Sequence, residues 1–460
     1  MSPIDNLIRA LRSKVDEQTR LIYAWELPSI MRKHILTGAM GSVYFVLFSG
    51  IYLVTLGNEF GLQYWQWGLL SAASSFALTL QLASAALVTR TGSRKTLWYV
   101  TALLGRMLRA LAVAVAFALS GRFPGAARAA FIGLLVLANC VDAFAAPPWF
   151  SWLADIIPEE HHGRFMGRRS AWIALGNICI LVPIGYGIDK VSDEWRLPAL
   201  MAIFAFAFAM GVLDLVIHRT IPEPPMSLPP ARRFWKEVAA PFLDPQYKPW
   251  LVFNACWTFS MTLGGSLATI YFVEDLGVKR NFLGGSLVLI MLPMIGTMLA
   301  GRKVGELVDR YGVKRMLFCG HLFWAILPAF WILATPQTAL WWLAASALTG
   351  SISSLTAMNA ANKLVTRLPE SAHVAMYVAV STCVGCLAGG MGPLLGGFIL
   401  NVLKSWSWVI GAWTIVGFHV LFVASLVLRL LSAQLIRNVV EPPSTNAPTE
   451  SDQAAAEQKA

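Results

Sequence analysis

The chain has 460 residues, of which 57% are hydrophobic and only 13% are charged. A soluble domain has about 45–50% apolar and about 25% charged residues, so a chain this poor in charge cannot cover a surface that faces water. The composition excludes a soluble enzyme, a disordered chain and a disulfide-rich secreted scaffold. It predicts an all-α integral membrane protein.

Twelve runs of the chain are apolar over the roughly 20 residues that a helix needs to cross a bilayer. They lie near 35–57, 64–88, 96–119, 130–152, 170–188, 198–217, 250–273, 282–301, 316–334, 338–360, 374–401 and 406–428. The polar residues 1–34 precede the first run. Residues 429–460 follow the last run and are expected to form a disordered tail.

The basic residues between these runs indicate which side each loop faces. With the N-terminus inside the cell, the inner segments contain 27 of the 36 Lys and Arg residues and the outer loops contain 7. This asymmetry predicts a multi-pass protein of a bacterial inner membrane with both termini in the cytoplasm. The net charge of +11 then reflects topology, and we expect no nucleic-acid partner.

The chain divides at residues 218–249, an inner loop with six prolines that is predicted to be a cytoplasmic linker between helical bundles at 35–217 and 250–428. Three motif pairs recur in the same order in the two halves: Glu59-x-Gly61-x6-Gly68 with Asp275-x-Gly277-x6-Gly284, TRTGSRK with DRYGVKR, and Ile157-Pro158-Glu159 with Leu368-Pro369-Glu370. Because each half has an even number of spans, the copies are parallel six-helix repeats. Secondary transporters use such repeats with a binding site between the halves.

The segment GELVDRYGVKR at residues 305–315 fills every position of the pattern G-x-x-x-D-R-x-G-x-K/R-K/R, and in this the chain resembles the major facilitator superfamily. The resemblance implies the major facilitator fold and a cytoplasmic lock of Asp309 and Arg310 against the start of the fifth span, near 163–169. The implied gate residues are Gly305, Asp309, Arg310, Gly312, Lys314 and Arg315, with Arg90 and Gly92 in the first-half copy. Thr89 replaces the aspartate in that copy, so we expect an asymmetric lock. The alternative is a basic loop that only fixes topology.

Spans one, four, seven and ten should line a central cavity, as the family resemblance implies. Each of these spans has one helical face enriched in polar and aromatic side chains. The candidates for substrate binding on them are Tyr44, Asn139, Asp142, Asn254, Trp257, Asn359 and Asn362. For each residue the alternative is a hydrogen bond between packed helices.

Charged residues inside the predicted spans are few, and a charge at that depth costs several kcal/mol unless it is paired or hydrated. Asp142 is expected to bind a cationic substrate group or to take up a proton, and a structural pair with Arg106 is the alternative. Arg106 and Arg109 could instead attract an anionic substrate. Asp214, near the inner end of the sixth span, is interpreted as an interfacial charge.

We interpret the chain as a secondary active transporter that moves a small organic solute by rocking its two halves around a central site, with a proton gradient as the energy source. The sequence contains no Walker, Gly-x-Ser-x-Gly or His-Glu-x-x-His motif, so we expect no enzymatic activity, cofactor or metal site. The expected partners are a small-molecule substrate, protons and membrane lipids, and the protein is expected to be a monomer. A lipid or amphiphile translocase is the main alternative, and a membrane sensor that lost transport is the second.

Overall fold

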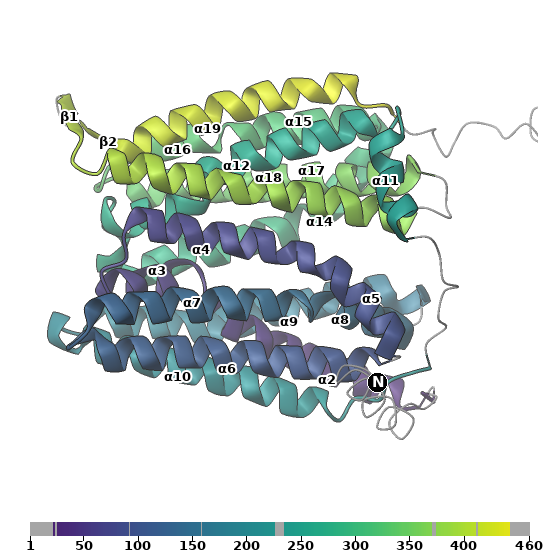
Figure 1. Cartoon of the computed structure of the whole chain (residues 1–460), viewed down its shortest axis with the longest axis horizontal. Coiled ribbons are helices and arrows are strands. Elements are labelled where there is room, and N and C mark those ends of the chain that lie inside the picture. The colour runs from purple at the N-terminus through teal and green to yellow at the C-terminus, as the bar shows by residue number, and fades with distance from the viewer. Residues whose placement is uncertain are drawn as a thin grey trace, which may run out of the picture.

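The computed structural model describes residues 22–23, 25–91, 93–157, 159–225, 234–369, 374–410 and 413–441. They form two helical halves that lie side by side (Figure 1). The helices of the N-terminal half are α2 (Leu27–Leu47) with α3 (Gly50–Glu59), α4 (Tyr64–Ala77) with η1 (Leu78–Leu80) and α5 (Gln81–Thr91), α6 (Arg94–Ser120), α7 (Pro124–Ala143) with α8 (Ala146–Ile156), α9 (Glu159–Asp189) and α10 (Asp193–His218).

The C-terminal half repeats this order of six spans. Its helices are α12 (Lys248–Glu274), α13 (Phe282–Ser286) with the π-helical η3 (Leu287–Met291) and α14 (Leu292–Tyr311), α15 (Val313–Ala325) with α16 (Leu327–Leu333), α17 (Ala339–Arg367), α18 (Val374–Val402), and α19 (Gly417–Gln434) with η4 (Leu435–Asn438). The short helix η2 (Val278–Arg280) precedes α13, and α11 (Phe234–Leu243) lies in the linker. The strands β1 (Ser407–Ile410) and β2 (Trp413–Val416) precede α19.

Twelve spans in two six-helix repeats are therefore present, as the sequence predicts. Length and hydropathy alone mark nine helices of the described residues as able to cross a membrane. The other three spans, α4–α5, α12 and α17, carry more hydroxyl and amide side chains along their length. We call the end of the bundle next to α11 the linker face and the end next to β1 and β2 the hairpin face; they lie at opposite ends in Figure 1.

Several predicted boundaries are wrong. The run 406–428 does not form one helix, because β1 and β2 pair as an antiparallel hairpin from Ser407↔Val416 to Ile410↔Trp413. Their aromatic and β-branched residues favour strands, so the last span shifts toward the C-terminus and α19–η4 takes up 429–438 of the expected tail. The fifth span begins at Glu159 instead of 170, and α2 begins at Leu27 inside the expected N-terminal segment. Residues 1–21 and 442–460 lie outside the described residues.

Proline breaks two of the spans, and a side chain of another helix replaces each lost backbone hydrogen bond. Pro148 has no N–H to donate to the carbonyl of Phe144, and the buried Ser84 of α5 donates its hydroxyl to that oxygen at 2.7 Å. Pro328 likewise has no N–H to donate to the carbonyl of Trp324 at the α15–α16 break. The Arg429 guanidinium of α19 donates to it at 3.4 Å.

We expect Arg429→Ala to destabilise the C-terminal half by about 2 kcal/mol or more, because hydrogen bonds from a charged group contribute about 1.5–3 kcal/mol each. Arg429 is 1% exposed, and it also donates to the carbonyl of Met261 at 3.0 Å. Thermal unfolding of the purified protein measures the effect, with the exposed Arg437→Ala as control. An unchanged melting temperature in Arg429→Ala would contradict this role.

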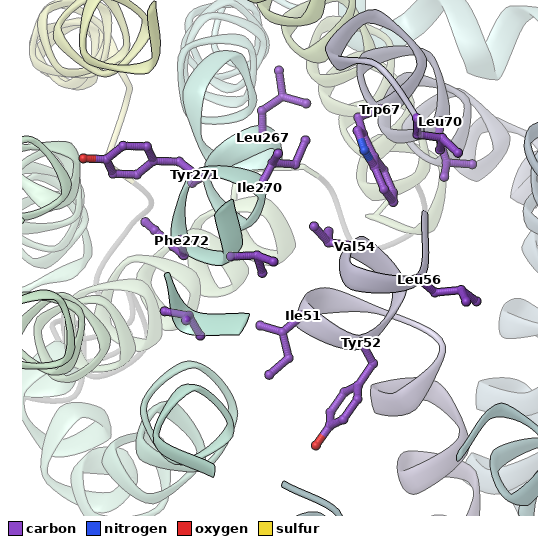
Figure 2. Close-up of a cluster of buried hydrophobic side chains, with 14 of the residues drawn as sticks. Ile51, Tyr52, Val54, Leu56, Trp67, Leu70, Leu267, Ile270, Tyr271 and Phe272 are labelled. Carbon is purple, nitrogen blue, oxygen red and sulfur yellow. The ribbon is translucent and has the colours of Figure 1, made fainter. Parts of the chain in front are cut away.

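The two halves meet at the hairpin face through a buried hydrophobic cluster. Ile51 and Val54 of α3 and Trp67 of α4 pack with Leu267 and Ile270 of α12 (Figure 2). Polar contacts between the halves surround the cluster. They are Asn58 Nδ2 to Glu274 Oε1 at 2.8 Å, the Tyr52 and Ser286 hydroxyls at 3.0 Å, the Asp189 carboxylate to the backbone N–H groups of Phe282 at 2.6 Å and Leu283 at 3.0 Å, and Arg196 to the Lys279 carbonyl.

Spans two and eleven also touch across the two halves, through glycines. A Cβ on Gly68 of α4 would lie 2.4 Å from the Pro393 carbonyl oxygen of α18, and one on Gly397 would lie 2.9 Å from the carbonyl oxygen of Tyr64. Neither glycine can carry a side chain unless the backbones separate. At these positions no lateral gap separates α4 from α18.

Candidate functional site

Two cavities within the helix bundle are lined by polar side chains of the spans. The N cavity, of about 400 Å³, lies within the N-terminal half, and its walls come from α2, α6, α7–α8, α9 and α10. The C cavity, of about 510 Å³, lies among α12, α17 and α18. Ser75 and Leu78 of the N-terminal half complete the C cavity, so this second cavity lies between the halves.

An ion pair joins α6 and α7 at the wall of the N cavity. Arg109 donates one guanidinium nitrogen to the Asp142 carboxylate and another to Asn139 Oδ1 at 2.8 Å. Asn139 Nδ2 donates in turn to Ser74 Oγ of α4 at 2.7 Å. The Arg109 side chain is 11% exposed and that of Asp142 is 34% exposed. Of the two, the carboxylate is therefore the group that a solute or water can reach.

Local structure explains why Asp142 can reach this position. It lies in the last turn of α7, next to the break before α8 where Pro147 and Pro148 stop continuous helical bonding. Across from it, α6 has Gly105, and a Cβ there would lie 1.8 Å from Asp142 Oδ1. The carboxylate thus occupies the space that a side chain at position 105 would fill.

We expect Gly105→Ala to lower the melting temperature, although Ala favours a helix over Gly by about 1 kcal/mol. The added methyl group displaces the Asp142 carboxylate and leaves Arg109 without its anion. Gly133→Ala on α7 is the matched control, because nothing lies within 4 Å of a Cβ there. If both variants had the same increase in melting temperature, the close contact between Gly105 and the Asp142 carboxylate would not contribute to stability.

A second charged network lies on the other side of the N cavity. Arg106 of α6 pairs with Asp214 of α10, whose other oxygen contacts His218 Nδ1 at 2.8 Å. His218 Nε2 lies 3.4 Å from the Thr37 hydroxyl. The Arg106 guanidinium also lies over the Tyr44 ring, 5.1 Å from its centroid. Arg106, Asp214, His218, Thr37 and Tyr44 all line the N cavity.

This arrangement corrects two expectations. Arg106 does not pair with Asp142, because Arg109, one turn further along α6, takes that carboxylate. Asp214 is not an interfacial charge, because it is 3% exposed and lies in the helix bundle. Each buried arginine of α6 therefore has an aspartate partner, and neither presents an uncompensated charge to the N cavity.

The C cavity has an uncharged polar wall. Asn254 of α12 lines it and donates to the backbone carbonyl of Ser381 of α18 at 2.8 Å, and Asn362 of α17 lines it as an exposed side chain. Trp257 and Asn359 are not among its lining residues. Trp257 is instead 4% exposed, with its ring 4.5 Å from that of His321, so it is a packing residue.

The residues of the basic motif lie at the linker end of α14 and the start of α15. Gly312 between the helices has φ +88°, a conformation that a side chain would strain. Lys314 Nζ donates to the Arg437 carbonyl of η4 at 2.8 Å, within the same half. The Arg310 guanidinium is 5.6 Å from the centroid of the neighbouring Tyr311 ring. Within the motif, Lys314 therefore links the start of α15 to η4.

The expected lock between the motif and span five stays a prediction. The side chains of Asp309 and Arg90, and residue Gly92, lie outside the part of the chain that the structure describes. Arg315 is exposed, and no atom lies within 4 Å of a Cβ built on Gly305.

Sequence reasoning missed Arg169, Asp214 and His218 as cavity residues. Asp214 and His218 are four residues apart, a spacing that places both on one helix face and could have signalled a pair. The sequence places Arg169 only in the expected lock segment near 163–169, at the start of the fifth span. Since α9 begins at Glu159, Arg169 instead lies on the third turn of a helix and reaches the N cavity.

Comparison with known proteins agrees with this architecture. The nucleoside transporter NupG has a TM-score of 0.64 at 12% identity over 90% of this chain and 98% of that chain. A D-xylose-proton symporter has a TM-score of 0.65 at 17% identity over 91% of this chain and 98% of that chain. The xylose transporter XylE from E. coli, partially occluded and inward open, has a TM-score of 0.62 at 15% identity over 92% of this chain and 100% of that chain.

At these identities the likeness to solved structures concerns the fold alone. No curated protein matches the sequence. The sequence model of the Major Facilitator Superfamily, in contrast, matches residues 34–306 and 304–457, which together span nearly the whole chain. The protein belongs to the Major Facilitator Superfamily and is a multi-pass membrane transporter in fold and family.

Proposed function

We propose that the protein is a secondary active transporter that moves a small organic solute across a bacterial inner membrane by alternating access, driven by protons. The linker face and both termini are cytoplasmic, in keeping with the excess of Lys and Arg in the segments of that face. The solute occupies the N and C cavities, and the two halves rock around it.

The observation that carries this proposal is the set of contacts that join the two halves at the hairpin face, next to a polar cavity between the halves. At the hairpin face, the halves share a buried cluster and four sets of polar contacts. The C cavity lies between the halves and is lined by uncharged polar groups, which suit a solute that must leave again. Breaking the hairpin-face contacts and forming others at the linker face would expose the cavities to the opposite side.

Asp142 is the proposed coupling group. Its carboxylate is a third exposed at the N cavity while its partner Arg109 is buried. Protonation of Asp142 would release Arg109 from the pair, so the charge at the cavity would change with the proton. Asn139 would keep Arg109 in place through its own hydrogen bond.

The test combines binding with transport. The melting temperature of the protein is measured in the presence of sugars, nucleosides, amino acids and organic acids, because a ligand that binds the folded state raises it. Each compound is tested at pH values of about 5.5 and about 7.5, so that a proton-linked effect on binding is visible. The compound that stabilises most is then offered in labelled form to proteoliposomes. We expect accumulation only under an inward proton gradient and its loss when an ionophore collapses the gradient. Equal uptake without the gradient would contradict proton coupling.

A second experiment, which needs no solute, measures whether the two halves alternate between two arrangements. Spin labels on Arg122→Cys and Lys404→Cys, in cysteine-free protein, report the distance between the halves at the hairpin face. We expect two distance populations whose ratio changes with pH. A single distance under all conditions would contradict alternating access.

A lipid translocase, the alternative from sequence, is less supported. It requires an opening between spans two and eleven or between spans five and eight. The glycine contacts of α4 with α18 close the first at the hairpin side. A Cβ on Gly185 of α9 would lie 3.0 Å from the Leu283 backbone, which closes the second there.

A further inference from the structure

We infer that the N cavity binds a ring-sized organic monocarboxylate and that Arg169 is the residue that recognises its carboxylate. The inference rests on the proposed transport function and names the substrate class of the same site. It depends on the charges around the cavity, the surroundings of Arg169 and the size and chemistry of the walls.

The charged side chains that the structure describes at the N cavity include one more cation than anions, and Arg169 is the unpaired one. Arg106 pairs with Asp214 and Arg109 pairs with Asp142, so these four groups are neutral together. Asp214 is further engaged by His218. Arg169 lines the same cavity and forms no ion pair with any of the described residues. A solute with a single negative charge would therefore neutralise the cavity.

Arg169 is held in position without using most of its donors. Its Nε donates to the His34 carbonyl of α2 at 3.4 Å, and its guanidinium lies 5.1 Å from the Trp149 ring centroid of α8. A Cβ on Gly38 would lie 2.8 Å from this guanidinium, so the side chain rests in a gap that glycine provides. A guanidinium has five N–H donors in a planar fork that matches a carboxylate. The two Nη nitrogens are thus available to a bidentate anion.

The rest of the cavity suits the body of such a ligand. Phe45, Trp149, Phe150 and Ile173 contribute apolar wall around Arg169, and the volume of about 400 Å³ is within the range of small-molecule sites. A cationic solute would meet Arg169 with like charge. A neutral solute would cover the guanidinium without compensating its charge, which is costly away from water.

The experiment compares probes that differ only in charge. The full-length protein is melted with benzoate and benzamide, nicotinate and nicotinamide, and 3-phenylpropionate and 3-phenylpropionamide. We expect at least one carboxylate to raise the melting temperature by about 2–5 °C at saturation, and its amide to have no effect. Arg169→Gln should abolish the shift and Arg169→Lys should retain part of it, because Lys keeps the charge but loses the bidentate geometry.

Arg168→Gln is the matched control. Arg168 is the exposed neighbour on the same helix and does not line the cavity, so this variant should keep the full shift. Equal stabilisation by an acid and its amide, an equal loss in Arg168→Gln and Arg169→Gln, or no shift with any of the three acids would each overturn the inference.

The outcome is separable from that of the transport proposal. Binding of a carboxylate that depends on Arg169, with a single fixed distance between the labelled halves, would support the site and contradict transport. Two exchanging distances without any effect of the acids would support transport and contradict the site.

Discussion

Asp142→Asn is expected to lower the stability of the protein by about 3 kcal/mol and to reduce proton-driven uptake at least about tenfold. The stability loss follows from geometry, because Arg109 is 11% exposed and would lose its carboxylate partner, with only neutral amide oxygens at positions 139 and 142 left as acceptors. The loss of uptake follows from the proposal that Asp142 is the group that exchanges protons. Thermal unfolding and proteoliposome uptake measure the two effects on the same preparation.

The double variant Arg109→Gln with Asp142→Asn separates the two roles. Removing both charges eliminates the uncompensated buried cation, so most of the lost stability should return. If Asp142 exchanges protons, uptake stays low and no longer depends on the proton gradient. If proton-driven uptake returns together with stability, the pair is structural and another group couples transport.

Asp155→Asn is the matched control for this comparison. Asp155 pairs with Arg94 in the same half but is about half exposed and lines neither cavity. Removing it should change stability only slightly, because the buried Arg94 keeps the Glu223 carboxylate as a second anionic partner, 3.6 Å from its Nε. Uptake should keep its dependence on the proton gradient.

Individual charged residues of the site were visible in the sequence, but their partners were not. Asp142, Arg106 and Arg109 stand out because charge is rare inside apolar spans. The pairing depends on which face of α6 meets α7 and which meets α10. Arg106 and Arg109 are three residues apart and so differ by only about 60° around the helix axis, yet Arg106 pairs with α10 and Arg109 with α7. Assigning the spans from hydropathy gives the depth of each residue in the membrane, but it does not give the rotation of each helix about its own axis.

The same limit explains the C cavity. The aromatic and polar stripe on span seven contains both Asn254 and Trp257, yet Asn254 lines the cavity and Trp257 packs against His321. Asn254 and Trp257 are three residues apart and differ by about 60° around the helix axis, so one can face the cavity while the other faces a neighbouring helix. Trp250, one further turn from Asn254, lines the cavity and donates to Ser381 Oγ at 2.8 Å. The twelve spans and their repeat were predictable because hydropathy and internal duplication do not depend on rotation.

The contacts at the hairpin face come from residues that no motif singled out. Asp189 is the last residue of α9, and its carboxylate accepts two backbone N–H groups in the first turn of α13, in the opposite half. Free N–H groups at a helix start attract an anion. Asp189 therefore joins the halves through main-chain atoms, so substitution of the side chains of Phe282 and Leu283 should leave this contact in place.

Asp189→Ala is expected to shift the protein toward a state that is open at the hairpin face, by roughly ten- to hundredfold in the ratio of the two states. Hydrogen bonds to a charged group contribute about 1.5–3 kcal/mol, and two of them exist only while this face is closed. The distance between the labels at positions 122 and 404 should lengthen in most molecules.

Asp193→Asn is the control, because Asp193 also lies at the hairpin face but its side chain is 96% exposed and, among the described residues, pairs with Arg196 of its own helix. The distribution of the distance between the labels in Asp193→Asn should match that of the parent protein. An unchanged distribution in Asp189→Ala would mean that the remaining contacts, chiefly the hydrophobic cluster around Ile51 and Ile270, keep this face closed. In that case Ile51→Ala, which removes apolar contact across the halves without touching Asp189, should open the face instead.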